Sequence, residues 1–278
     1  MLEILKAILF GIVEGITEWL PVSSTGHMII LNEFVTMNCS ADFWEFFLVV
    51  IQLGAIIAVI ILFWDSIFPF QFKDKNKPVI KMETIMLWVK VVVACIPAAV
   101  VGILFDDVFE ALFYHAIPVA IALIVFGVLF IVVEELNRNK KPRIKSLDDI
   151  GFKEAIIIGI FQLIAAVFPG TSRSGATIVG ALMIGVSRSI ASEFTFIMAI
   201  PVMFGASLLK VIKLGLAFTA NEFILLAVGM IVAFVVSLLV IKALMNFVKK
   251  HSFTFFGFYR IILGMIIIVL EIMGVITV

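Results

Sequence analysis

Two short polar segments stand out in this chain because their residue types can do chemistry. Residues 14–27 read EGITEWLPVSSTGH and hold two carboxylates, a run of hydroxyls and an imidazole. Residues 169–177 read PGTSRSGAT, again with a proline and hydroxyls, and add an arginine. A guanidinium donates two parallel hydrogen bonds to a phosphate. Acids, a histidine and an arginine together indicate phosphoryl chemistry.

The first segment contains a pair of acids, Glu14 and Glu18, that are four residues apart. This spacing predicts that both carboxylates lie on one face of a helix. Two anions that close repel each other unless a cation or a proton lies between them. We expect them to hold Mg²⁺ or Ca²⁺ beside substrate phosphates, or one of them to be a protonated general acid. A proton-sharing structural pair is the simpler alternative.

The hydroxyls that follow these acids predict the start of a second helix. Pro21 ends the first helix, and Ser23, Ser24 and Thr25 can cap the next one and present its N-terminal N–H groups to an anion. His27 lies one turn further on. It is close enough in sequence to deprotonate a serine hydroxyl or to be a nucleophile itself.

The second polar segment repeats this arrangement with an added positive charge. Ser172, Ser174 and Thr177 flank Arg173, so a helix N-terminus and a guanidinium would face the same phosphate. The structural alternative is that these hydroxyls only cap and pack helices, and that Arg173 extends to an interface.

The rest of the chain is apolar enough for a bilayer. Hydrophobic residues make up 63% of it, far above the fraction that is typical of soluble domains. The mean hydropathy is +1.25. We therefore expect an all-α integral membrane protein and no nucleic-acid partner. Six windows are long enough to span the hydrocarbon: 47–69, 84–105, 116–135, 193–213, 223–246 and 256–277.

Two further apolar segments, 3–33 and 151–187, are each interrupted by Pro, Gly and Ser. Neither half of either segment is long enough to cross the hydrocarbon of a bilayer. Broken helices are tolerated in a membrane only where they line an enclosed or watery cavity. We therefore predict two re-entrant helix hairpins, and ionisable residues at that depth favour a functional site.

An offset of 148 residues aligns the two halves of the chain. It pairs Gly11 with Gly159, Pro21 with Pro169 and Ser24 with Ser172. We predict two repeats, 1–136 and 151–278, each with one re-entrant hairpin and three spans, within one integrated membrane domain. Three spans are an odd number, so the second repeat would be inverted and the polar breaks would meet near the midplane.

Positive charge gives an orientation for this arrangement. The linker 137–150 carries Arg138, Lys140 and Lys141, and the loop after the first span carries Lys73, Lys75, Lys77 and Lys81. Such loops face the cytoplasm. Both termini would then lie outside.

Four segments of the chain resemble the undecaprenyl-diphosphate phosphatases of the bacitracin-resistance type. They are EGITEWLPVSSTGH at 14–27, VVIQLGAIIAV at 49–59, PGTSRSGAT at 169–177 and GVSRSIASEF at 185–194. The resemblance implies hydrolysis of undecaprenyl diphosphate in the bacterial inner membrane, with the site opening to the extracytoplasmic side and a divalent cation. It implies recycling of the lipid carrier for cell-wall synthesis and bacitracin resistance.

The same resemblance implies the roles of the site residues. The family's catalytic acids correspond to Glu14 and Glu18, its serine and histidine to Ser24 and His27, and its phosphate-binding arginine to Arg173. We favour attack by Ser24 with His27 as base. Attack by His27 itself, or by water that Glu18 activates, uses the same residues.

The sequence leaves open an alternative function and the oligomeric state. Inverted repeats with broken helices are also transporter architecture, so a polyprenyl-phosphate transporter or flippase is the alternative function. The partners expected are a prenyl diphosphate lipid and membrane lipids, with the prenyl tail in an apolar groove beside the hairpins. The sequence is compatible with a homodimer.

Overall fold

A computed structural model describes residues 1–72 and 78–276. Within those residues the chain forms eleven helices and no β-strand. Six helices are long and apolar enough to cross a bilayer, which confirms an all-α, multi-pass membrane protein. They are α3 (Ala41–Leu62), α5 (Met82–Phe113), α6 (Ala116–Asn137), α9 (Arg188–Leu214), α10 (Ala220–Val248) and α11 (Thr254–Ile272).

The first span differs in position from the expected window 47–69. Helix α3 begins at Ala41 because the Ser40 side chain caps it, accepting a hydrogen bond from the Phe43 N–H at 3.2 Å. It ends at Leu62, and a separate short helix, α4 (Trp64–Ile67), follows. The apolar run continues through this break, so hydropathy alone placed the span too late in the chain.

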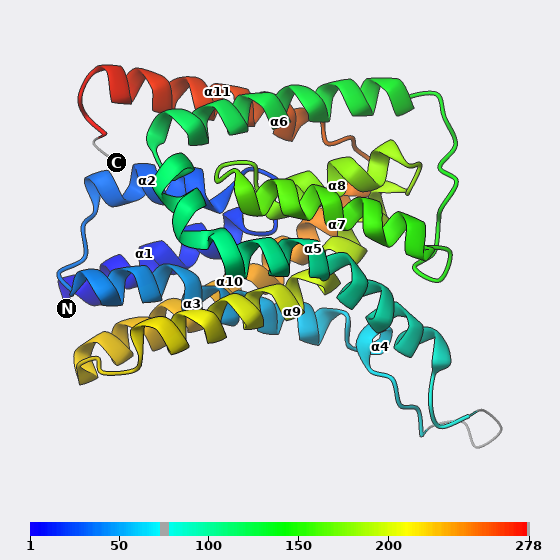
Figure 1. Cartoon of the computed structure of the whole chain (residues 1–278), viewed down its shortest axis with the longest axis horizontal. Coiled ribbons are helices and arrows are strands. Elements are labelled where there is room, and N and C mark those ends of the chain that lie inside the picture. The colour runs from blue at the N-terminus through cyan, green and yellow to red at the C-terminus, as the bar shows by residue number, and fades with distance from the viewer. Residues whose placement is uncertain (73–77, 277–278) are drawn as a thin grey trace.

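The two interrupted segments each form a pair of short helices. These are α1 (Leu2–Thr17) with α2 (Ser24–Phe34), and α7 (Phe152–Val167) with α8 (Arg173–Met183). At 1.5 Å per residue their lengths are about 16 to 24 Å, short of the roughly 30 Å of hydrocarbon. The hairpins extend from opposite ends of the bundle, and their tips meet in its interior (Figure 1). The expected breaks near Pro21 and Pro169 are confirmed.

The first helix of each hairpin packs closely on a long helix. Helix α1 lies against α10, and α7 lies against α5. A Cβ on Gly11 would lie 2.7 Å from the Gly229 carbonyl oxygen, and one on Gly159 would lie 2.3 Å from that of Ala94. Only glycine permits these approaches. The two glycines are the pair that the 148-residue offset aligns, and the duplication itself stays a prediction.

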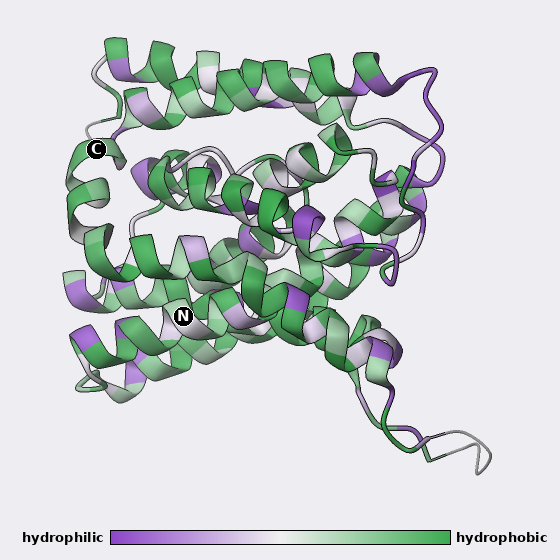
Figure 2. Cartoon of the chain, turned by 45° about the vertical axis from the view of Figure 1, so that its right-hand side comes forward, coloured by the Kyte–Doolittle hydropathy of each residue, from purple (hydrophilic) through white to green (hydrophobic). Residues whose placement is uncertain are grey.

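The spans are coloured as hydrophobic along most of their length (Figure 2). Large side chains such as Ile103 and Leu239 are exposed, as a lipid-facing surface requires. The linker between α6 and α7 is polar, and Arg138, Lys140 and Lys141 are exposed on it. Lys73, Lys75 and Lys77, which also supported the orientation, lie outside the described residues.

Candidate active site

The carboxylate of Glu18 lies where the first hairpin turns. Helix α1 ends at Thr17, so Glu18 occupies the C-cap position, and its N–H still donates to the Glu14 carbonyl at 3.0 Å. This retains the expected four-residue relation between the two acids. The chain then turns through Pro21, and α2 begins at Ser24.

Two serines cap the second helices of the hairpins in the same way. Ser23 Oγ accepts from the Gly26 N–H at 3.3 Å, and Ser172 Oγ accepts from the Gly175 N–H at 3.2 Å. Their φ angles are 73° and 67°, and no other non-glycine residue in the described chain has a positive φ. Such backbone strain persists only where the surroundings hold it, and it is common at functional sites.

These caps correct the predicted pairing of Ser24 with Ser172. The equivalent cap positions are Ser23 and Ser172, 149 residues apart, because the cap follows the proline by two positions in the first turn and by three in the second. Ser24 and Arg173 are therefore the first residues of α2 and α8. The 148-residue offset missed this because it keeps one register from the first helix of each hairpin through the proline to the cap.

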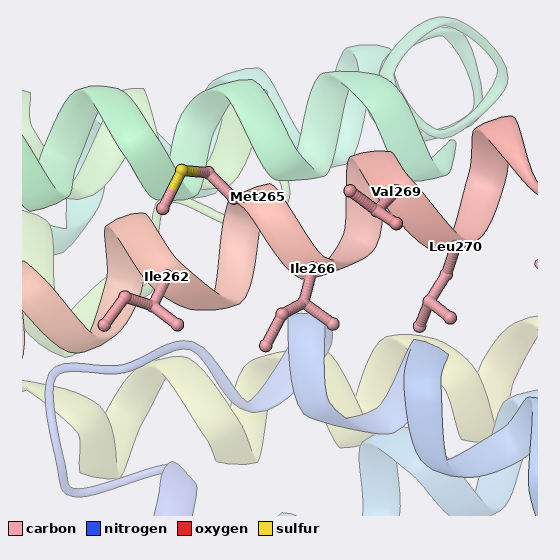
Figure 3. A pocket seen from close by; sticks show the side chains of 5 residues that line it. All are labelled: Ile262, Met265, Ile266, Val269 and Leu270. Atoms are coloured by element: carbon pink, nitrogen blue, oxygen red, sulfur yellow. The ribbon is translucent and has the colours of Figure 1, made fainter.

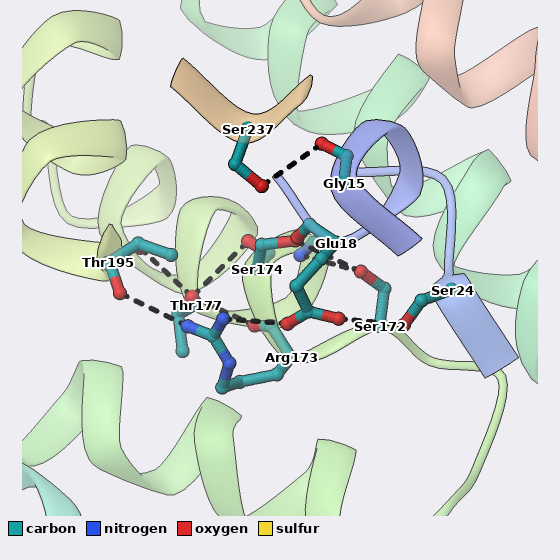
Figure 4. A network of polar contacts seen from close by, with 10 residues as sticks. Gly15, Glu18, Ser24, Ser172, Arg173, Ser174, Thr177, Thr195 and Ser237 are labelled. Atoms are coloured by element: carbon teal, nitrogen blue, oxygen red, sulfur yellow. Dashed lines mark hydrogen bonds and ion pairs between the residues drawn. The ribbon is translucent and has the colours of Figure 1, made fainter. Parts of the chain in front are cut away.

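Three groups from the two hairpins converge on Glu18 (Figure 4). Arg173 Nη2 donates to Glu18 Oε1 at 2.8 Å, and Ser24 Oγ donates to Glu18 Oε2 at 2.7 Å. Ser174 Oγ donates to the Glu18 backbone carbonyl at 3.1 Å. The site therefore joins a carboxylate, a guanidinium and a hydroxyl that come from opposite halves of the chain.

A second set of contacts holds Arg173 in place. Its Nη1 donates to the Thr195 carbonyl at 3.2 Å, and Thr177 Oγ1 donates to the Arg173 carbonyl at 2.9 Å. The two threonine hydroxyls bond each other at 2.9 Å. Ser172 and Ser174 hydroxyls lie 3.2 Å apart. Thus the predicted residues of the second segment all lie at this site.

Glu14 is buried, with 2% of its surface exposed. Its Oε1 has no hydrogen-bond partner within the described chain. An unpaired buried carboxylate oxygen is costly, and a hard cation or a proton removes that cost. No group of three or more His, Cys, Asp or Glu side chains suited to a metal occurs among the described residues. Two carboxylates with nearby hydroxyls fit Mg²⁺ or Ca²⁺ if substrate phosphates complete the shell.

His27 has partners other than the expected Ser24. Its Nδ1 lies 2.7 Å from the Ser23 carbonyl oxygen, and its Nε2 lies 2.7 Å from the Tyr259 hydroxyl. A carbonyl only accepts, so Nδ1 carries the proton and Nε2 accepts from Tyr259. The expected His27–Ser24 contact is wrong for this structure, because the ring turns back onto its own helix while Ser24 donates to Glu18.

The sequence reasoning missed three residues near the site. Thr195 orients Arg173 through its backbone, and Tyr259 bonds His27, and neither had a distinguishing sequence signal. Arg260 was detectable, because an arginine inside an apolar span such as 256–277 is rare and usually functional. Thr25 is half-buried, and its hydroxyl makes no hydrogen bond within the described residues.

The fold and this site define an integral membrane protein in which a carboxylate, a guanidinium and hydroxyls of two helix hairpins meet. The chain belongs to the family described as bacitracin resistance protein BacA, whose model matches residues 7–266. It is similar to proteins named undecaprenyl-diphosphatase. That of Desulfitobacterium hafniense is 60% identical over 268 residues, 96% of each chain. That of Acetivibrio thermocellus is 58% identical over 96% of this chain and 97% of its own, and that of Enterococcus faecalis is 55% identical over 97% of both.

Proposed function

We propose that this protein hydrolyses undecaprenyl diphosphate to undecaprenyl phosphate and inorganic phosphate. The observation that carries the proposal is the Glu18 carboxylate bonded at once by Ser24 at 2.7 Å and Arg173 at 2.8 Å. A nucleophile, its proton acceptor and a phosphate-binding cation are thereby assembled in one place. The kinship with three proteins named undecaprenyl-diphosphatase supports the substrate.

In the proposed reaction Ser24 Oγ attacks the terminal phosphorus. The new Oγ–P bond forms while the Ser24 proton passes to Glu18, the acceptor within hydrogen-bond distance. The bond between this phosphorus and the bridging oxygen breaks, and undecaprenyl phosphate leaves. Water then cleaves the phosphoserine and releases inorganic phosphate. Attack by His27, or by water activated at Glu18, are the alternatives that the site also accommodates.

Arg173 and the helix termini would stabilise the charge of the transferred phosphoryl group. Ser24 and Arg173 begin α2 and α8, so the first N–H groups of both helices lie at the site. Donors placed where charge develops supply much of enzymatic phosphoryl transfer. The hydroxyls of Ser23, Thr25, Ser172, Ser174 and Thr177 are proposed as the phosphate-binding set.

We propose Glu14 and Glu18 as the residues that hold a divalent cation, Mg²⁺ or Ca²⁺. The unpaired Oε1 of Glu14 supports this assignment. The cation supplies charge neutralisation for the diphosphate when it is bound.

An apolar groove on α11 offers a place for the prenyl tail. It has a volume of about 250 Å³ and is lined by Ile262, Met265, Ile266, Val269 and Leu270 (Figure 3). Tyr259, which bonds His27, lies one helical turn before Ile262. A tail that leaves the site past Tyr259 would therefore meet an apolar stripe directly.

The proposed location is the bacterial inner membrane, with the linker 137–150 in the cytoplasm and the site opening to the opposite side. The exposed Arg138, Lys140 and Lys141 of that linker support the orientation. The start of α1 and the end of α11 lie on the side of the bundle opposite this linker (Figure 1).

The direct test is phosphate release from undecaprenyl diphosphate by the purified protein in detergent, with and without a chelator. We expect release that stops when divalent cations are removed. A protein that moves polyprenyl phosphate between leaflets of a vesicle but releases no phosphate would instead be the transporter alternative. If the protein is a homodimer, the protein mass in the detergent complex of the same preparation should be twice the mass of one chain.

A further inference from the structure

Arg260 is the most completely buried charged side chain of the transmembrane helices described. Its exposed surface is 0%, and it lies about two turns from the start of α11. No carboxylate lies within ion-pair distance of it among the described residues. A buried guanidinium without a counter-ion is destabilising, so its presence in a span calls for another physical reason.

All the hydrogen bonds that Arg260 donates go to backbone carbonyls. Nη1 donates to Pro21 at 3.3 Å in the turn of the first hairpin. Nη2 donates to Gly170 at 3.0 Å and to Thr171 at 2.6 Å in the turn of the second. Nε donates to Leu123 on α6 at 3.4 Å. One side chain therefore joins the tips of both hairpins.

The carbonyls in the two turns lie one or two residues before the two strained caps. Pro21 lies two residues before Ser23, and Thr171 lies directly before Ser172, the residues with positive φ. Fixing the preceding carbonyls helps to hold that backbone. The caps in turn set the first residues of α2 and α8, Ser24 and Arg173.

We infer that Arg260 is a positioning residue that sets the alignment of the two hairpin tips, so that Ser24 and Arg173 meet at the same phosphoryl group. This inference rests on the proposed function and concerns the same site. Arg260 touches no reacting atom and acts through Arg173 and Ser24. Because a misplacement of about 1 Å can lower a rate roughly a hundredfold, the effect should appear in kcat.

The guanidinium of Arg260 packs closely against a glycine of α8. A Cβ on Gly175, in the first turn of α8, would lie 2.7 Å from Arg260 Nη1. Gly175→Ala should therefore displace the guanidinium while the arginine is retained. It provides a second variant that disturbs the same contact.

The test compares Arg260→Lys with Arg188→Lys in the phosphate-release assay. Arg188 is bonded to Glu134 near the start of α9 and lies outside the site, so its variant is the matched control. For Arg260→Lys we expect kcat to fall about a hundredfold with little change in KM, because lysine cannot bridge both turns. The control should retain wild-type kcat.

A double-mutant cycle with Arg173→Lys separates positioning from general loss of structure. If Arg260 acts through Arg173, the fall in kcat caused by Arg173→Lys should be at least about tenfold smaller in the Arg260→Lys background. Multiplicative effects, or wild-type kcat in folded Arg260→Lys, would overturn the inference. If Arg260→Lys does not fold, Gly175→Ala takes its place, with the same expected fall in kcat and the same overturning result. No phosphate release by the wild-type protein would instead refute the proposed function.

Discussion

Glu18 and Arg173 are 155 residues apart in the chain, yet their side chains form an ion pair at 2.8 Å. The exposed fractions of the two side chains are only 9% and 13%. Neither makes another ion pair within the described residues. Since an unpaired charge in such a place is costly, the pair ties the tip of one hairpin to the tip of the other.

Arg173→Ala should abolish turnover. It removes the donor that we assign to the phosphoryl oxygens, a loss of about 3 kcal/mol or more in transition-state stabilisation. Phosphate release measures the effect, and Arg138→Ala, at an exposed ion pair on the linker end, is the control that should stay active. A near wild-type rate for Arg173→Ala would show that this residue is no phosphate clamp.

Ser24 and His27 are distinguished as nucleophiles by the adduct that each would form. Attack by Ser24 predicts an acid-stable phosphoserine in rapid-quench samples, absent from Ser24→Ala. An acid-labile, base-stable adduct that survives Ser24→Ala and disappears in His27→Ala would identify histidine instead. If no adduct forms and solvent oxygen enters in a single inverting step, water is the nucleophile.

Tyr259→Phe tests the role of the hydrogen bond to His27. The phenol donates to Nε2 at 2.7 Å, so its loss removes one contact that holds the imidazole. We expect a fall in kcat of about fivefold, matching the roughly 1 kcal/mol of a typical hydrogen bond. A loss as large as that of His27→Ala would mean that the hydroxyl takes part in proton transfer, contrary to the Glu18 assignment.

Glu14→Gln tests the divalent-cation site. It keeps the side-chain size and removes one charged ligand, so we expect the Mg²⁺ or Ca²⁺ concentration for half-maximal activity to rise about tenfold or more. Titration of cation into chelator-treated protein measures this. Glu3→Gln changes an acid near the start of the same helix that is paired with Lys6, and it should leave the titration unchanged. Equal titrations for wild type and Glu14→Gln would remove Glu14 from the site.

Single cysteines at Asn139 and Asn221 test the orientation in a background with Cys39 and Cys95 replaced. Asn139 lies on the linker and Asn221 at the start of α10, and both are exposed. The charge of the linker predicts that a membrane-impermeant reagent added to intact cells labels Asn221→Cys only. Labelling of Asn139→Cys under those conditions would reverse the assigned topology.

The hydropathy of the chain and the positions of Pro, Gly and Ser were enough to predict the number of spans and the two broken segments. Six spans and two broken segments follow from apolar length and from the residues that end helices, which are local properties. The error at the first span arose where the apolar run continues past Leu62 although the helix ends there. Hydropathy detects burial in lipid, whereas a helix end depends on backbone hydrogen bonds.

Glu14, Glu18, Ser24, His27 and Arg173 were recognisable from the sequence because ionisable and hydroxyl groups are rare in an apolar chain. Their partners were not. Ser24 donates to Glu18 and not to His27, and the meeting of Arg173 with Glu18 depends on how two hairpins approach from opposite ends. The sequence determines which residue types are present. The distances between groups in its two halves are decided by tertiary packing, which here includes the contacts of Arg260 with both hairpin turns.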